Sequence, residues 1–217
     1  MNAHRAKGII FDMDNTLLKS RINFAEMKRA VFRLLAEHGC CQPDLDWTSH
    51  TASQLIEIGR QSAQMTQALE EKMWAAVTEI EKEGMHGAVL EEHAVEVLEE
   101  LRQRCSLYIL TNNARAAAME ALQRTGIAHF FADVVGREQM AELKPSPSGV
   151  RCILRQQREW PVEAWTMVGD SWIDGKAAQD AGIRFVAYQG KEGEMANHGV
   201  HPLATIQSLR ELLPYFS

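Results

Sequence analysis

Two aspartates separated by one residue, Asp12 and Asp14, follow a short apolar stretch at 7–11. The β-branched and aromatic residues of that stretch predict a buried strand, and Asn15 and Thr16 supply turn chemistry behind it. Two carboxylates at the end of a core strand repel each other, and burial disfavours both charges. A bound divalent cation would remove that cost and make one aspartate a usable nucleophile. The alternative is an Asx-rich turn, which is favoured for the pair taken alone.

Three further groups of residues that could take part in catalysis or binding occur later in the chain. Thr111 and Asn112 follow a second apolar stretch, Asp170 follows another, and Lys144 lies in a proline-rich loop ahead of a predicted helix. Each has a structural explanation when taken singly, because Thr, Asn and Asp cap helices and lysines are commonly solvated. Helix capping and solvation do not explain why all of them lie at strand ends or in adjoining loops, so together they indicate a functional site.

The elements that would position these groups alternate from residue 87 onward. Strand-length apolar stretches and amphipathic helical patterns follow one another, which predicts a doubly wound parallel sheet of α/β class with both faces covered. In such a sheet ligands bind at the carboxyl ends of the strands. The expected strands are 7–11, 107–110, 130–135, 165–168 and 183–188, and the expected helices are 91–104, 114–125, 148–158, one ending at 181, and 206–215.

A helical block interrupts this alternation between the first strand and the rest of the sheet. Helical spacing of apolar residues predicts helices over 24–38, 51–60 and 65–83, the last closed by Gly84, with no strand pattern among them. We therefore expect a core domain made of 1–18 and 87–217 and an inserted all-α cap domain over 19–86. The hinges between them are expected near 18–22 and 84–88.

Bulk properties limit the classes of partner. The chain has 217 residues and a formal net charge of -6, which gives no reason to expect nucleic acid or an anionic membrane surface. No apolar stretch approaches the roughly 20 residues that span a bilayer, and an early aspartate excludes a signal-peptide core. We therefore expect a cytoplasmic protein, a monomer or homodimer. Its cysteines lack metal-ligand spacing and are expected to be reduced: Cys40, Cys41, Cys105 and Cys152.

Four motifs in order carry a resemblance to a known family. They are DMDNT after the first strand, ILTNN, the lysine in LKPSP, and VGDSWID. This combination resembles the haloacid dehalogenase superfamily, and specifically its phosphoglycolate phosphatase-like members with an α-helical (C1) cap inserted after the first motif. The resemblance covers essentially the whole chain. It implies a Rossmannoid core and a magnesium-dependent phosphatase that hydrolyses a small phosphorylated metabolite through an aspartyl-phosphate.

The resemblance also implies catalytic roles. Asp12 would attack the phosphorus, and Asp14 would protonate the leaving oxygen and then take a proton from the hydrolytic water. Thr111 and the amide of Asn112 would bind phosphoryl oxygens. Lys144 would offset charge on Asp12 and on the transferring group.

The implied cofactor is Mg²⁺. Its ligands would be the carboxylates of Asp12 and Asp170 and the backbone carbonyl of Asp14, with water and a phosphate oxygen completing an octahedron. Asp174 lies four residues after Asp170, on the same side of a helix start. We expect it to hold a metal-bound water or to orient Lys144, and direct binding of the metal is the alternative role.

Several alternatives stay open from the sequence. Asp14 favours phosphoryl transfer over dehalogenation, because a leaving halide needs no proton. A phosphomutase resembling β-phosphoglucomutase is the nearest rival, and a phosphonoacetaldehyde hydrolase, which needs a cap lysine such as Lys28 or Lys72, is a weaker one. A non-enzymatic binding protein on this scaffold belongs to a different class. Retention of Asp12 and Asp14 together with the lysine and the later aspartate argues against it.

The sequence does not name a substrate. Many phosphatases of this family carry an acidic residue shortly after the first motif, whereas this chain reads Leu17-Leu18-Lys19-Ser20. Basic residues that could meet an anionic substrate are Lys19, Arg21, His50, Arg60 and Arg115, although a solvated charge is the commoner role for each.

Overall fold

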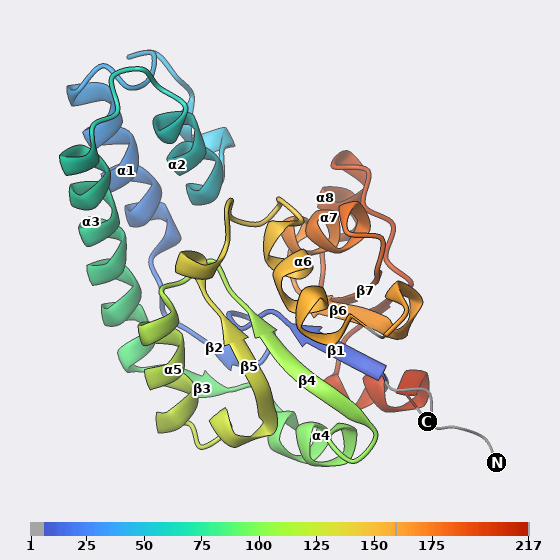
Figure 1. Ribbon diagram of the computed structural model, residues 1–217. Helices are drawn as coiled ribbons and strands as arrows, with labels where there is room; N and C mark the ends of the chain where they lie inside the picture. The colour runs from blue at the N-terminus through green and yellow to red at the C-terminus, as the bar shows by residue number, and fades with distance from the viewer. Residues whose placement is uncertain (1–6, 159, 217) are drawn as a thin grey trace. The chain divides into compact units, whose positions relative to one another are not determined.

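The computed structural model describes residues 7–158 and 160–216 (Figure 1). These residues form two compact units. One contains the chain up to Ser20 together with Ala88 onward, and the other is Arg21–Gly87. The two units are described separately.

The first unit is built on a parallel sheet of six strands in the order β5-β4-β1-β6-β7-β8 (Figure 1). The chain passes from β1 to one side of the sheet and later crosses to β6 on the other side, so strand order reverses at β1. This confirms the predicted α/β doubly wound class. The strands are β1 Lys7–Phe11, β4 Cys105–Leu110, β5 Phe131–Val135, β6 Trp165–Gly169, β7 Arg184–Tyr188 and β8 Ala204–Ile206.

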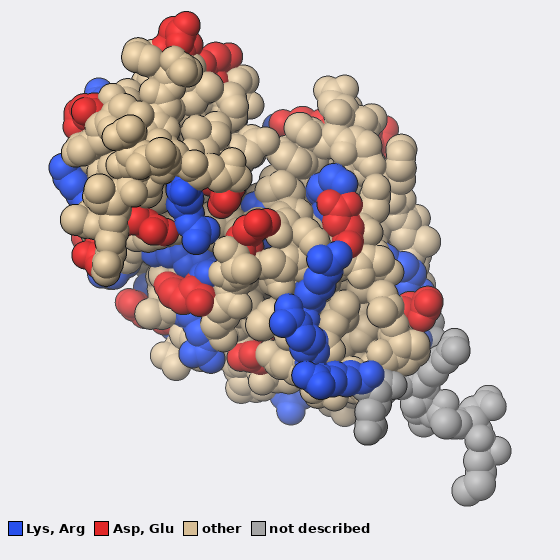
Figure 2. Space-filling model, turned by 45° about the horizontal axis from the view of Figure 1, so that its top comes forward, with Lys and Arg blue, Asp and Glu red and all other residues tan. Residues whose placement is uncertain are grey.

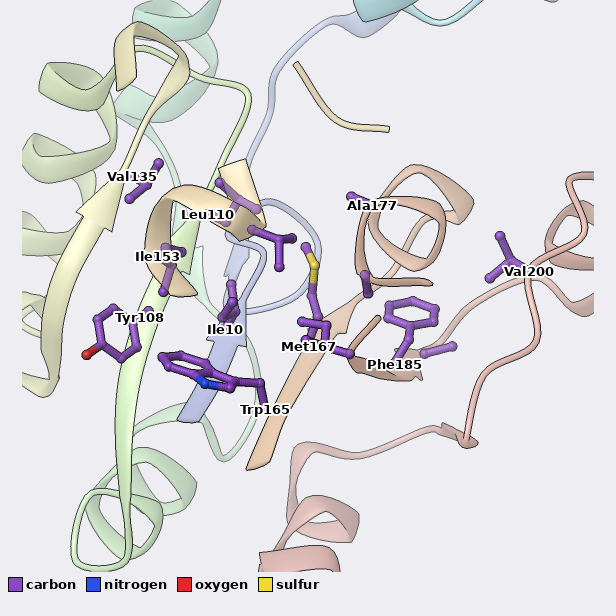
Figure 3. Close-up of a cluster of buried hydrophobic side chains, with 14 of the residues drawn as sticks. Ile10, Tyr108, Leu110, Val135, Ile153, Trp165, Met167, Ala177, Phe185 and Val200 are labelled. Atoms are coloured by element: carbon purple, nitrogen blue, oxygen red, sulfur yellow. The ribbon is translucent and has the colours of Figure 1, made fainter. Parts of the chain in front are cut away.

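Helices pack on this sheet through small and aliphatic side chains. One face of the sheet presents Ile10, Tyr108 and Trp165 to helices α6 and α7 (Figure 3). Residues alternate between faces along a strand, so Ile9 and Phe11 point to the opposite face, and both are fully buried. The α-helices of this unit are α4 Ala94–Leu101, α5 Arg115–Arg124, α6 Ser148–Leu154, α7 Trp172–Asp180 and α8 Glu192–Asn197. The 3₁₀ helices are η2 Ala128–Phe130, η3 Arg137–Gln139, η4 Arg155–Gln157, η5 Val162–Ala164 and η6 Leu209–Phe216.

The C-terminal part of the chain differs from its prediction. The helix expected over 206–215 is replaced by the end of β8 and by the 3₁₀ helix η6, and α8 was not predicted. Strand β8 has only three residues, which is too short to show an alternating pattern. Pro214 lies inside η6 and has no backbone N–H to donate, which disfavours a regular α-helix there.

A two-stranded antiparallel ribbon joins the segments that lead to and from the inserted block. Its strands are β2 Leu18–Lys19 and β3 Val89–Leu90. The next residue, Glu91, is buried, and its backbone N–H donates to the Leu17 carbonyl at 2.9 Å. Its carboxylate accepts a hydrogen bond from the Tyr188 hydroxyl at 2.9 Å. These contacts hold both linker segments against the core, and two-residue strands leave no pattern from which to predict them.

The second unit is entirely helical. Helix α1 packs against both α2 and α3, and the bounds are α1 Phe24–Glu37, η1 Trp47–Ser49, α2 Ala52–Arg60 and α3 Gln67–His86. Polar residues begin the helices as capping chemistry requires: the Asn23, Thr51 and Thr66 side chains each accept a backbone N–H of the first turn. The all-α character expected over 19–86 is what the structure shows for this unit, but the first residue of the predicted block, Lys19, lies in strand β2 instead.

Gly84 does not close α3 as the sequence predicts. The helix continues to His86, with Gly87 as its C-cap. A Cβ on Gly84 would lie 2.4 Å from the Ile22 Cα, so this glycine lets two backbones approach closely inside the unit. The Arg21 N–H donates to the Gly84 carbonyl at the same point. A glycine serving close approach and one serving as a helix stop look alike in a sequence.

The molecular surface carries both signs of charge. Acidic side chains lie beside basic ones on the face shown in Figure 2, in keeping with the modest net charge of -6. Across the described ranges, no helix is both long and apolar enough to span a bilayer.

The packing of β1 against β6 predicts that a larger residue at Gly8 destabilises the fold. A Cβ built there would lie 2.2 Å from the ring of Trp165, which is fully buried. Gly8→Ala should lower the free energy of unfolding by about 1–3 kcal/mol, because the ring has no room to move. Urea unfolding measures this. Gly193→Ala is the matched control, since nothing lies within 4 Å of its Cβ position, and it should change stability by less than about 1 kcal/mol. Equal effects would contradict the packing argument.

Candidate active site

The predicted polar residues gather where the strand order reverses. Asp12 directly follows β1, Thr111 follows β4 and Asp170 follows β6, and β1 lies between the other two strands. The backbone continues the sheet into these residues, because the Asp12 N–H donates to Val168 and the Thr111 N–H to Val135. Three neighbouring strand ends therefore bring these side chains to one edge of the sheet.

Lys144 joins this group from the loop ahead of α6. Its Nζ lies 2.5 Å from Asp12 Oδ1, 2.7 Å from Asp174 Oδ1 and 3.0 Å from the Leu110 carbonyl. The side chain is buried, and these acceptors use all three ammonium protons. Burial alone would lower the pKa of Lys144, but Asp12 and Asp174 raise it above its ordinary value, so the ammonium stays charged.

The Asn112 side chain holds the backbone that carries Lys144. Asn112 Nδ2 donates to the Lys144 carbonyl at 3.0 Å, and Asn112 Oδ1 accepts the Lys144 N–H at 2.8 Å. This pair of hydrogen bonds fixes the lysine loop to the end of β4. The sequence interpretation assigned the Asn112 amide to a phosphoryl oxygen and did not predict this contact with the lysine loop, because no pattern links residues 32 positions apart.

Asp14 is buried beside the end of β4. Asn113 Nδ2 donates to Asp14 Oδ2 at 2.5 Å, while Asp14 Oδ1 is buried and has no hydrogen-bond partner among the described residues. Burial raises the pKa of Asp14, and the neighbouring Ser20 hydroxyl and Asn113 amide offset part of that rise. The sequence interpretation missed Asn113, although the second asparagine of ILTNN was a visible signal.

Asp170 and Asp174 complete the acidic group. One carboxylate oxygen from each of Asp12, Asp170 and Asp174 lies within 4.8 Å of the others. Asp174 also caps α7, since its Oδ2 accepts the Ser171 N–H at 3.1 Å. A Cβ on Gly169 would lie 2.5 Å from that oxygen, so glycine is required for the approach.

The site contains more negative than positive charge. Burial raises the pKa of Asp12 well above its ordinary value, with Lys144 offsetting part of the rise. Burial and the Asp174 carboxylate raise the pKa of Asp170 to about 7. One ammonium thus faces four neighbouring carboxylates, Asp14 included. Clustered carboxylate oxygens with uncompensated charge fit a hard divalent cation, which prefers oxygen ligands.

Two basic residues singled out in the sequence are engaged elsewhere in the first unit. The Arg115 guanidinium donates to the Val134 carbonyl at 2.9 Å and lies 3.6 Å from Asp133, so it is tied to β5 rather than to the aspartates. Lys19 Nζ lies 3.2 Å from Glu91. Neither is therefore a free cation for a substrate in this conformation.

The remaining basic candidates belong to the helical unit. Arg60 forms an ion pair with Glu70 at 3.0 Å, and His50 Nδ1 lies 2.9 Å from the Asp46 carbonyl. Arg21 contributes its backbone N–H to the contact with Gly84. Their part in substrate binding stays a prediction.

Comparison with known proteins agrees with this fold. The family model described as haloacid dehalogenase-like hydrolase matches residues 9–188. A phosphoglycolate phosphatase of Vibrio vulnificus is 31% identical, over 84% of this chain and 83% of the relative. One of Vibrio parahaemolyticus is 29% identical, over 98% and 97%. A solved structure from Haemophilus somnus, described as a predicted phosphoglycolate phosphatase, shares 20% identity with a TM-score of 0.68, covering 98% of this chain and 99% of its own.

The chain therefore belongs to the haloacid dehalogenase-like hydrolase family, as one of its phosphatases. The resemblance drawn from the four motifs is confirmed, and so is the expectation of an enzyme.

The raised pKa of Asp170 predicts how stability depends on pH. In the folded state this carboxyl titrates near 7, against an ordinary value of 3.8, so the folded protein holds a proton that the unfolded chain has lost. In a metal-free buffer with chelator, the free energy of unfolding should therefore fall as pH rises from about 5 to about 8. Asp170→Asn should flatten this decline and be the more stable protein near pH 8.

Urea unfolding across this pH range measures the effect. Asp180→Asn, which changes an exposed carboxylate of α7, is the control and should keep the wild-type slope. An Asp170→Asn slope equal to that of the wild type would contradict the assigned burial cost.

Proposed function

We propose that this protein is a magnesium-dependent phosphatase that hydrolyses a small-molecule phosphate monoester through an aspartyl-phosphate on Asp12. One observation carries the proposal. A buried ammonium, Lys144, bridges Asp12 and Asp174, and a second buried carboxylate, Asp14, lies two residues after Asp12 and has one oxygen without a hydrogen-bond partner in the described part of the chain. Family membership supports the same reaction class.

In the first step a carboxylate oxygen of Asp12 forms a bond to phosphorus as the bond from phosphorus to the leaving oxygen breaks. Asp14 gives its proton to that leaving oxygen, so an alcohol departs rather than an alkoxide. Burial raises the pKa of Asp14, which favours the protonated form needed here.

In the second step water attacks the phosphorus of the aspartyl-phosphate. Asp14, now ionised, accepts the proton of that water, and the bond between phosphorus and the Asp12 oxygen breaks. Inorganic phosphate leaves, with Asp12 ionised and Asp14 protonated as at the start. The two aspartates thus keep separate roles through the whole cycle.

The ends of β4 and of the lysine loop would hold the phosphoryl group. Thr111 Oγ1 accepts the Asn113 N–H at 3.1 Å, which leaves the hydroxyl proton available to donate to a phosphoryl oxygen. The Asn112 backbone amide would donate beside it. Lys144 supplies positive charge that a transferring phosphoryl group needs.

The residues fit magnesium. The carboxylates of Asp12 and Asp170 and the backbone carbonyl of Asp14 would hold it, and the bound cation would neutralise the repulsion between the nucleophile and the phosphate. Asp174 already accepts from Lys144 Nζ and from the Ser171 N–H, so its proposed role is to orient the lysine.

The substrate proposal rests on relatives. Proteins named phosphoglycolate phosphatase match most of this chain, so 2-phosphoglycolate is the first compound to test. We also propose that the helical unit acts as a lid that excludes water during reaction. In support, this unit is inserted soon after Asp14, and the ribbon of β2 and β3 holds both of its linkers together.

The nucleophile is tested by Asp12→Asn. This variant should lose at least about 10³-fold of wild-type phosphate release, because an amide oxygen is a poor nucleophile. The assay measures inorganic phosphate from 2-phosphoglycolate, a panel of sugar phosphates and 4-nitrophenyl phosphate. Asp180→Asn is the control and should retain wild-type turnover. Undiminished activity of Asp12→Asn would overturn the assignment, and isomerised sugar phosphate without phosphate release would indicate a mutase.

The metal is tested by removal and return. Chelation with EDTA should abolish turnover, and excess Mg²⁺ should restore the initial rate, because the acidic cluster repels a phosphate dianion without a cation. Asp170→Asn should raise the Mg²⁺ concentration needed for half-maximal rate by about 10-fold or more. Full activity in EDTA would contradict the proposed metal site.

A further inference from the structure

The backbone of Asn113 is held by two hydrogen bonds, one through its N–H and one through its carbonyl. Its N–H donates to Thr111 Oγ1 at 3.1 Å, and its carbonyl accepts the Arg137 N–H at 3.0 Å. The residue is buried, with 5% of its surface exposed. Because the backbone at the end of β4 is held in this way, the amide group has little freedom to move away from its contact.

That contact is with only one of the two oxygens of Asp14. Asn113 Nδ2 lies 2.5 Å from Oδ2, and an amide nitrogen can only donate, so Oδ2 serves as an acceptor. Oδ1 is buried, and neither it nor the neighbouring Ser20 hydroxyl has a partner in hydrogen-bond geometry among the described residues. A buried polar oxygen without a partner is costly, and at a reactive site it indicates an atom kept open for a ligand.

We propose that Asn113 is a positioning residue that reserves Oδ2 of Asp14 and leaves Oδ1 to exchange the proton. The inference rests on the proposed function. In the first step the proton on Oδ1 passes to the leaving oxygen as the phosphorus–oxygen bond breaks. In the second step the same Oδ1 takes the proton of the attacking water. Asn113 itself neither gains nor loses a proton.

A purely structural role for Asn113 makes a different prediction. If the amide only ties the end of β4 to the turn after β1, its loss should slow every substrate by the same factor. If it aims the proton donor, its loss should matter only where the leaving group needs a proton. Alkyl phosphates release a strongly basic alkoxide, whereas 2,4-dinitrophenyl phosphate releases a weakly basic phenolate that departs without protonation.

The test is single-turnover release of the leaving group by wild type and by Asn113→Leu, with Mg²⁺ and excess enzyme. Leucine has the same number and branching of side-chain heavy atoms as asparagine, although it is bulkier, and it has no donor. Release from the alkyl phosphate that the wild type hydrolyses best should fall by about 10–100-fold, and release from 2,4-dinitrophenyl phosphate by less than about 3-fold. Single turnover isolates the first step, so slow hydrolysis of the aspartyl-phosphate does not mask the difference.

Gln139→Leu provides the matched control. Gln139 Oε1 accepts the Gly136 N–H at 2.9 Å, so the substitution removes a side-chain amide hydrogen bond from the adjacent segment and leaves the contact to Asp14 intact. It should change both substrates by the same factor. Asn113→Ala serves as a second variant should Asn113→Leu not fold, and circular dichroism checks each protein.

Two outcomes would overturn the proposal. Equal losses on both substrates, with an active wild type, would leave Asn113 with a structural role only and would not touch the proposed function. A wild type that releases neither leaving group would overturn the proposed function and this inference with it.

Discussion

The structure depends on one buried ammonium among four carboxylates. Lys144 donates to Asp12, to Asp174 and to a strand-end carbonyl, and its removal would leave several negative charges without a partner in a buried site. A buried charge of this kind persists only if its partners are held in place. The Asn112 amide holds the lysine loop, and Gly169 makes room for the Asp174 carboxylate that also caps α7. The lysine loop, the end of β4 and the start of α7 therefore all help to hold Lys144 among the carboxylates.

The reversal of strand order at β1 explains why this balance arises at one place. Parallel strands have their carboxyl ends at the same edge of the sheet. Strand β1 lies between β4 and β6, and the chain reaches these two strands by separate crossovers. Each strand ends in a short polar segment, so residues distant in the sequence meet without any long loop between them. The fold thereby concentrates negative charge in a buried place, and the raised pKa values of Asp12, Asp14 and Asp170 express the cost. A cation would offset that cost.

Much of the fold follows from local patterns in the sequence, and the rest depends on contacts that leave no such pattern. The long apolar stretches predicted the central strands, because a strand buried on both faces reads as a continuous hydrophobic run. The ribbon of β2 and β3 and the edge strand β8 are too short to show a period. Motif order indicated which strand ends carry chemistry. It did not indicate that the Asn112 and Asn113 side chains hold Lys144 and Asp14, since those hydrogen bonds join residues 32 and 99 positions apart.

The two aspartates of the first motif differ in what contacts them, and this difference separates their chemistry. Burial raises the pKa of both, but the largest offsetting group is a full charge, Lys144, for Asp12, whereas for Asp14 the neutral Ser20 and Asn113 side chains act more strongly than Lys144. A nearby ammonium favours an ionised carboxylate far more than an amide does. The Lys144 ammonium in contact with Asp12 favours the ionised form that attack on phosphorus requires, whereas the Asn113 amide can donate to Asp14 Oδ2 whether or not the other oxygen carries a proton. Two identical side chains one residue apart acquire different roles because the sheet presents them to different partners.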